Sequence, residues 1–140
     1  FENSCGLHPD GTVACWGYNS AGEGSPPTGT FQQVAAGNHH TCGLHADSTV
    51  VCWGGNGFGQ LSPPTPNFLQ VSTGVNYTCG VKPDGTLACW GRNDASQASP
   101  PPGNFQQVSA GADFACALRQ DGSPTCWGNP ADGRAPANPP

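Results

Sequence analysis

The sequence predicts an all-β fold of four disulfide-stapled repeats, each 37 residues long, that form the blades of a β-propeller or an arc or stack of such blades. Two observations carry this prediction. Pairs of Cys recur every 37 residues, and a Trp follows the second Cys of each pair. Short strand-like segments are separated by Gly and Pro clusters, and no segment has helical periodicity. The recurring residues are Cys5, Cys42, Cys79 and Cys116, then Cys15, Cys52, Cys89 and Cys126, then Trp16, Trp53, Trp90 and Trp127.

The chain is interpreted as a single repeat array over residues 1–140. Its copies are a partial one at residues 1–30 and three more at residues 31–67, 68–104 and 105–140. Each of the last three begins with a Phe-containing segment, which the partial copy lacks. Because an unpaired sheet edge recruits strands, we expect the hairpin at Cys5 to receive such a strand from more chain or from a neighbouring molecule.

Each repeat is expected to contain three strands. In the second copy they cover residues 31–37, 40–44 and 49–53, followed by an Asn-x-x-Gly turn at residues 56–59 and a Ser-Pro-Pro tip at residues 62–64. The first strand begins at a Phe, and the third ends at the Cys-Trp pair. Gly and Pro in the last two segments end the sheet of one repeat before the next begins.

The turn between the second and third strands explains the Cys spacing. His8-Pro9-Asp10-Gly11 suits a type I turn with Pro at its second position, and Gly11 suits the left-handed residue of a bulged three-residue loop. Such a loop places Cys5 directly opposite Cys15, at the separation that a disulfide requires. Ser48 stands where a Gly is expected, so that turn is predicted to be slightly strained. The predicted bridges are Cys5–Cys15, Cys42–Cys52, Cys79–Cys89 and Cys116–Cys126.

The alternative for these Cys is zinc. Zinc ligands usually lie two to four residues apart, whereas nine residues separate the Cys of each pair here. The even number of Cys in a chain poor in large apolar residues favours disulfides. Because disulfides persist in oxidising compartments, we expect a secreted, extracellular or cell-surface protein.

The composition excludes several classes of function. Only four Lys and Arg are present and the net charge is −5, so no surface for nucleic acid is expected. No apolar run is long enough for membrane insertion. The four turn carboxylates are expected to be structural, and the adjacent His39 and His40 point to opposite faces of a strand, so they do not share a metal. No catalytic constellation is identified, and we expect neither an enzyme nor a cofactor.

The segment at residues 33–44, followed by Asp47, Thr49 and Val51-Cys52-Trp53-Gly54, resembles the repeat of the regulator of chromosome condensation superfamily. It is most similar to the secreted, Cys-containing branch, which includes bacterial surface proteins and the ectodomains of plant crinkly-type receptor kinases. This resemblance implies a β-propeller whose blades are the repeats, and it implies binding rather than catalysis.

Two positions vary among the copies while the residues around them are kept. Repeat scaffolds carry binding residues at exposed positions of this kind, and neutral surface drift is the alternative. The first position precedes the first Cys and the second precedes the hairpin turn. The candidate partner-binding residues are His39, His40, Tyr77, Asp113 and Phe114 at the first position, and His45, Lys82 and Arg119 at the second.

Candidate glycosylation sites are of two kinds. Asn76-Tyr77-Thr78 is an N-glycosylation sequon. The Ser-Pro-Pro tips resemble hydroxyproline-glycan sites of plant and green-algal wall glycoproteins, although rigid polyproline-like turns are the plainer interpretation. The tip residues are Pro26, Pro27, Pro63, Pro64, Pro100, Pro101 and Pro102.

These features favour a non-enzymatic extracellular scaffold in a cell-surface or fibrous assembly. Its partners would be other protein chains, including copies of itself, and covalent glycans. The alternative function is a soluble β-propeller module that recognises a protein or a glycan, as a receptor ectodomain or an inhibitor does.

Overall fold

The computed structural model describes residues 2–129, and this part of the chain contains only strands and the turns that join them. Among the described residues, no helix is long and apolar enough to cross a membrane. The strands are β1 (Asn3–Leu7), β2 (Val13–Gly17), β3 (Gln33–Ala36), β4 (His40–Leu44), β5 (Val50–Gly54), β6 (Gln70–Thr73), β7 (Tyr77–Val81), β8 (Leu87–Gly91), β9 (Phe105–Ala110), β10 (Phe114–Arg119) and β11 (Pro124–Gly128).

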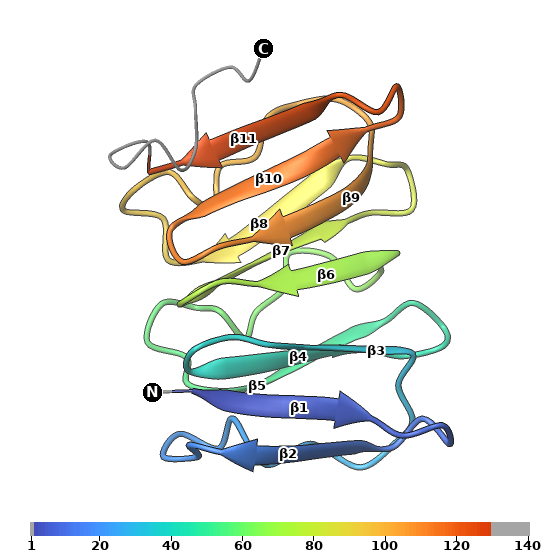
Figure 1. Cartoon of the computed structure of the whole chain (residues 1–140), viewed down its shortest axis with the longest axis vertical. Helices are drawn as coiled ribbons and strands as arrows, with labels where there is room; N and C mark the ends of the chain where they lie inside the picture. Colours follow the sequence, from blue (N-terminus) through green and yellow to red (C-terminus); the bar gives the residue numbers. More distant parts are fainter. Residues whose placement is uncertain (1, 130–140) are drawn as a thin grey trace.

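The strands form a series of small antiparallel sheets that follow one another along the longest axis of the molecule (Figure 1). The first sheet consists of β1 and β2, and each later sheet adds a third strand, in the orders β3-β4-β5, β6-β7-β8 and β9-β10-β11. Every pairing is antiparallel. The all-β prediction is confirmed.

Each hairpin has the predicted register and disulfide. Cys5 lies opposite Cys15 in the first sheet, and the same pairing occurs in the other three. All four predicted bridges are present. Gly11 has a φ of 86°, and Ser48 adopts a φ of 71° at the same position of its turn. The prediction of a strained turn at Ser48 is therefore confirmed.

The Asp of each hairpin turn is structural, as expected. The Asp10 carboxylate accepts hydrogen bonds from the Thr12 hydroxyl at 2.6 Å and from the Thr12 backbone N–H at 2.9 Å. These bonds lower the pKa of Asp10 below its ordinary value, because they stabilise the charged form. Asp47, Asp84 and Asp121 make the same pair of bonds in their own turns.

The core lies between successive sheets. Phe68, Val71 and Trp90 of the third sheet pack on Cys42 and Leu44 of the second. The fourth sheet packs on the third in the same way, with residues one repeat further along. Each sheet thus buries apolar surface that it could not bury alone, which is the usual basis of stability in repeat proteins.

Hydrogen bonds between sheets repeat with the same period. The indole Nε1 of Trp53 donates to the carbonyl of Glu23 at 3.0 Å, and Trp90 and Trp127 donate to the carbonyls of Gln60 and Gln97 at 2.9 Å. Each Trp therefore bonds to the turn that ends the preceding repeat. These bonds fix the spacing of the sheets.

Candidate binding surface

A concave surface lies where the loops between the first and second strands of successive repeats meet. Its volume is about 400 Å³. It is lined by residues 36–38, 73–75 and 110–112, which occupy the same positions in three repeats, and by residues 2–4 of the first sheet. We call this concavity the axial pocket. All four sheets contribute to it, so its shape depends on how the repeats are arranged.

Glycines allow the backbones to approach closely at the axial pocket. A Cβ at Gly37 would lie 2.6 Å from the Gly74 carbonyl oxygen, and a Cβ at Gly74 would lie 2.4 Å from that of Gly111. Only glycine fits at such distances. The pocket is therefore lined largely by main chain and small side chains.

The first candidate position is not uniformly exposed. His40 and Tyr77 have no exposed surface, so the expectation that these two residues are available to a partner is wrong. Their side chains point into the interface between sheets, where His40 Nε2 hydrogen-bonds with Thr78 Oγ1 at 2.7 Å and the Tyr77 hydroxyl donates to the Phe114 carbonyl. Phe114, at the equivalent position of the fourth sheet, is partly buried.

Burial also keeps both side chains neutral. Loss of solvation lowers the pKa of His40 to about 4. The same effect raises the pKa of Tyr77 above its ordinary value. Both groups are uncharged near neutral pH, and they serve the contact between sheets rather than a ligand.

The other two residues at this position, His39 and Asp113, directly follow residues that line the axial pocket, Asn38 and Ala112. His39 is partly exposed, and its Nε2 accepts a hydrogen bond of 3.3 Å from the side-chain amide of Asn38, a pocket residue. Asp113 is partly exposed and accepts a bond of 2.8 Å from the Asn129 amide. Both residues therefore keep part of their polar surface accessible.

The second candidate position lies at the opposite end of the strands, in the hairpin turns. The ring of His45 stacks on Phe31 with centroids 4.3 Å apart, and the Arg119 guanidinium lies 4.8 Å from the ring centroid of Phe105. Each therefore covers the Phe of its own sheet. Lys82 is partly exposed in the third turn. The structure does not bring the two candidate positions together.

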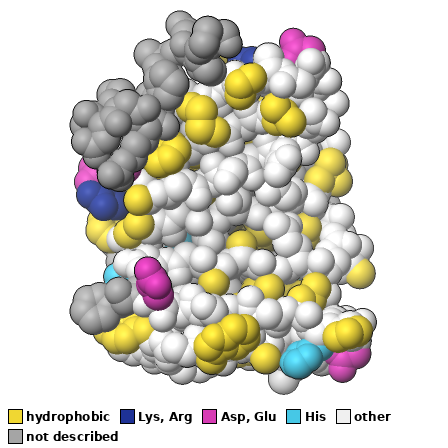
Figure 2. Space-filling model, viewed as in Figure 1, with side chains coloured by type: hydrophobic (Ala, Val, Ile, Leu, Met, Phe, Trp, Pro, Cys, Tyr) yellow, Lys and Arg dark blue, Asp and Glu magenta, His cyan; other side chains and the backbone are white. Residues whose placement is uncertain are grey.

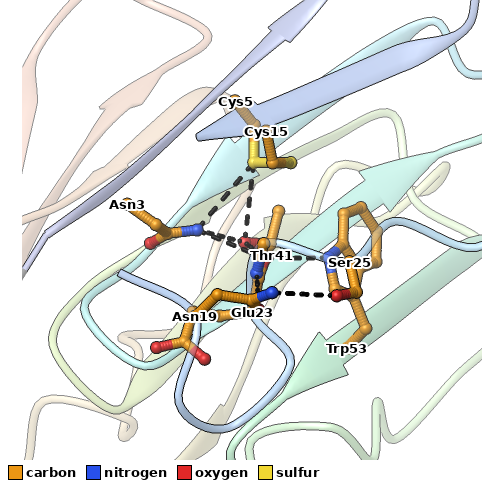
Figure 3. Close-up of a disulfide and its surroundings, with 9 residues drawn as sticks. Asn3, Cys5, Cys15, Asn19, Glu23, Ser25, Thr41 and Trp53 are labelled. Atoms are coloured by element: carbon orange, nitrogen blue, oxygen red, sulfur yellow. Dashed lines mark hydrogen bonds between the residues drawn. A yellow bond between two sulfur atoms is a disulfide. The ribbon is translucent and has the colours of Figure 1, made fainter. Parts of the chain in front are cut away.

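A buried polar cluster beneath the first disulfide was not predicted from the sequence (Figure 3). The Glu23 carbonyl accepts bonds from Thr41 Oγ1 at 2.9 Å and Asn3 Nδ2 at 3.3 Å, in addition to the Trp53 indole. The side chain of Glu23 is fully buried, and its Oε2 accepts from the Ala21 N–H at 2.8 Å. The sequence did contain one signal for this cluster, because Glu23, Gln60 and Gln97 recur one repeat apart.

The candidate glycosylation sites differ in accessibility. Pro27, Pro64 and Pro102 are exposed, whereas Pro26, Pro63, Pro100 and Pro101 are partly buried. Asn76 is partly exposed, but Thr78 of the same sequon is fully buried. Within residues 2–129, no cluster of three or more His, Cys, Asp or Glu side chains has a geometry suited to a metal ion.

The pattern known as the regulator of chromosome condensation (RCC1) repeat matches residues 31–60, 68–97 and 105–134. The chain belongs to the RCC1 repeat family. The matched segments begin at the three Phe residues that open the complete repeats. No curated protein sequence matches this RCC1-repeat chain.

Solved structures of two plant receptor ectodomains resemble the RCC1-repeat chain. The CRINKLY WD40 ectodomain of the Arabidopsis thaliana receptor kinase ACR4 is 33% identical, with a TM-score of 0.76 over 99% of this chain and 49% of that one. The entire ectodomain of the Physcomitrella patens receptor kinase CR4 is 28% identical, with a TM-score of 0.72 over 90% of this chain and 39% of that one. This chain thus spans about half, or less, of their length.

A more distant structure shows the fold alone. Saccharomyces cerevisiae Prp20p is 19% identical, with a TM-score of 0.78 over 90% of this chain and 43% of that one. Its binding properties to Gsp1p and histones have been described for that protein. Together these likenesses confirm the propeller-like repeat fold and the resemblance to crinkly-type ectodomains, and they support a binding scaffold.

Proposed function

We propose that this RCC1-repeat chain is a non-enzymatic extracellular scaffold of a cell-surface or fibrous assembly, and that its partners are other protein chains. The observation that carries the proposal is the disulfide at the same register of all four sheets. Structural disulfides form and persist in oxidising compartments such as the extracellular space. The similarity to plant receptor ectodomains supports the same location.

The chemistry of the surface supports binding rather than catalysis. The axial pocket presents main chain and small side chains, and the buried His40 and Tyr77 are neutral. The face in Figure 2 is mostly uncharged, with its few charged side chains near the margins. A surface of this kind suits contact with another protein more than stabilisation of a charged transition state.

The regular stack supports a structural role. Each sheet uses the same contacts to hold the next, so the array has a defined period. These contacts bury Trp53 and Trp90, which are 8% and 6% exposed.

The test begins with native material kept under non-reducing conditions. Chemical cross-linking with mass spectrometry should connect this chain to other protein chains in a surface or extracellular fraction, and negative-stain microscopy should show filaments or sheets containing it. Recovery of the chain only as a reduced, unassociated intracellular protein would refute the proposal.

A soluble binding module is the second candidate, and the axial pocket favours it. All four sheets contribute to the pocket, Asn38 places a polar side chain in its lining, and the partly exposed His39 and Asp113 directly follow lining residues in the sequence. This function predicts discrete particles in the same micrographs. It also predicts that Asn38→Ala and His39→Ala weaken binding of a protein or glycan partner, whereas His45→Ala at the opposite end of the strands does not.

A further inference from the structure

Three asparagines occupy the same position in the turns that follow β2, β5 and β8. They are Asn19, Asn56 and Asn93, and all three are exposed. The side-chain carbonyl of each accepts a hydrogen bond from the main-chain N–H five residues later, at 2.7, 3.0 and 2.8 Å respectively. Each asparagine therefore closes its turn in the same way, so the three turns can be compared residue by residue.

The side-chain nitrogen of Asn56 lacks a contact that its two equivalents make. In the other turns, Nδ2 of Asn19 and of Asn93 donates to the hydroxyl of the serine six residues later, at 3.0 and 2.9 Å. Ser62 stands at the corresponding position of the second turn, but among the described residues no hydrogen bond joins it to the Asn56 amide. The protein therefore holds the amide group of Asn56 through its oxygen alone.

The residue after Asn56 also differs from its equivalents. Gly57 follows Asn56, whereas Ser20 and Asp94 follow the other two asparagines, and this is the one Asn-Gly pair in the sequence. A Cβ at Gly57 would meet no atom within 4 Å. The Gly57 N–H donates to no acceptor in the part of the chain that the structure describes. The main-chain nitrogen beside the Asn56 side chain is thus both unhindered and unpaired.

We propose that Asn56 is a site of spontaneous deamidation, and that its isoaspartate product loosens the contact between the second and third sheets. The Gly57 nitrogen attacks Cγ of Asn56. The new C–N bond closes a cyclic imide, and the side-chain nitrogen leaves as ammonia with the proton of the Gly57 N–H. Water then opens the imide at either of its C–N bonds. Cleavage at Cγ gives aspartate, and cleavage at the main-chain carbonyl gives isoaspartate, in which the main chain runs through Cγ.

The turn that Asn56 closes contributes to the contact between these sheets. Gln60 lies within this turn and is 2% exposed. Its side-chain oxygen accepts from the Phe58 N–H at 2.8 Å, and its carbonyl accepts from the Trp90 indole at 2.9 Å. Aspartate keeps an acceptor for the Leu61 N–H, whereas isoaspartate adds a carbon to the main chain and displaces that acceptor. The isoaspartate form therefore alters the support of the bond between Gln60 and Trp90.

Asn19 and Asn93 are internal controls for a direct test. The oxidised protein is incubated at mildly alkaline pH, digested at acidic pH and mapped by mass spectrometry, with the aspartate and isoaspartate peptides separated by chromatography. Asn56 should convert about tenfold or more faster than either control. Equal rates at the three positions would overturn the proposal. So would an Asn56 that stays intact in the folded protein while it converts in the urea-denatured chain, because the turn would then protect it.

A matched pair of variants tests the role of the glycine. Gly57→Ser gives this turn the Asn-Ser pair of the first turn and should slow conversion by about tenfold or more. The fold is retained, because the space at this position is open and its φ is not positive. Phe58→Ser changes an exposed residue of the same turn and should convert at close to the wild-type rate. A Gly57→Ser protein that converts as fast as the wild type contradicts the proposed reaction.

The effect on the sheets is measured on the separated products. The deamidated forms carry an additional negative charge, so ion exchange separates them from the starting protein. In the isoaspartate form the indole N–H signal of Trp90 should shift in NMR spectra, whereas those of Trp53 and Trp127, which bond to the equivalent turns, should not. Asn56→Asp reproduces the other product and should leave all three signals in place. An unchanged Trp90 signal in the isoaspartate form would refute the loosening of the sheets.

Discussion

The side-chain amide of Gln33 forms two hydrogen bonds with the main chain of Val71 in the next sheet. Its Nε2 donates to the Val71 carbonyl at 2.8 Å, and its Oε1 accepts from the Val71 N–H at 3.1 Å. Gln70 repeats the arrangement with Val108, at 2.7 and 2.8 Å. The inner strands of neighbouring sheets do not pair with one another, so these amides replace a strand ladder.

Substitution of one such glutamine should destabilise the fold. In Gln70→Ala, the N–H and carbonyl of the buried Val108 lose both partners, which should lower the free energy of unfolding by about 1–3 kcal/mol. Urea denaturation under non-reducing conditions measures the change. Gln107→Ala is the matched control: Gln107 is exposed at the last described sheet, and the expected change is within about 0.5 kcal/mol. Equal losses in the two variants would show that the paired amides contribute no stability.

Substitution of the glycines that line the axial pocket should also destabilise the fold. A Cβ at Gly74 would lie 2.4 Å from the Gly111 carbonyl oxygen and 2.1 Å from the Tyr77 ring, so Gly74→Ala forces the sheets apart. We expect a loss of about 1–3 kcal/mol or more. Gly57→Ala adds the same methyl group in open space and should leave the unfolding midpoint nearly unchanged. A stable Gly74→Ala protein would mean that the sheets can shift without cost.

Acidification should destabilise the protein through His40. The folded pKa is about 4 and the ordinary value is 6.5, so between these values the unfolded chain binds a proton that the folded chain does not. Stability is therefore lost as pH falls from 6.5 towards 4, by up to about 3 kcal/mol at the lower limit. Denaturation measured between pH 7 and 5 avoids most of the titration of the turn Asp carboxyls.

Two histidine variants isolate this effect. His40→Tyr places the residue of the third repeat at the same position and removes the titrating group, so the pH dependence over this interval should flatten. His39→Gln changes the partly exposed neighbour and should keep most of the wild-type slope. If His40→Tyr retains the full slope, another group is responsible.

The hairpins could be predicted because their determinants are local. A bulged three-residue loop sets the register, and that register places Cys5 opposite Cys15 without reference to the rest of the chain. The left-handed conformation of Ser48 followed from its alignment with Gly11. The number and order of the sheets followed from the period of the Cys.

The exposure of the candidate residues could not be predicted in the same way, because it depends on the neighbouring sheet. Asn3, His40 and Tyr77 share one position but bond to Thr41, Thr78 and Phe114 respectively. Their variation resembles that of a binding surface, yet all three side chains bond to the next sheet, Asn3 and His40 to equivalent Thr hydroxyls and Tyr77 to a main-chain carbonyl. Glu23 was missed for a related reason, since a polar residue in a turn is usually exposed and this one is covered by the following repeat.

Glycosylation of the Ser-Pro-Pro tips stays a prediction, and the structure narrows the candidate sites to the exposed prolines. Pro27, Pro64 and Pro102 are exposed, so sugars at these positions would not disturb the sheets. We expect the native protein to be heavier than the bare oxidised chain by multiples of a sugar residue. Such sugars would help to keep a chain with few charges in solution. Intact-mass spectrometry before and after chemical deglycosylation measures the difference, and alanine at these three positions should remove most of it. A native mass equal to that of the chain with four disulfides would contradict the prediction and leave these prolines as turn formers.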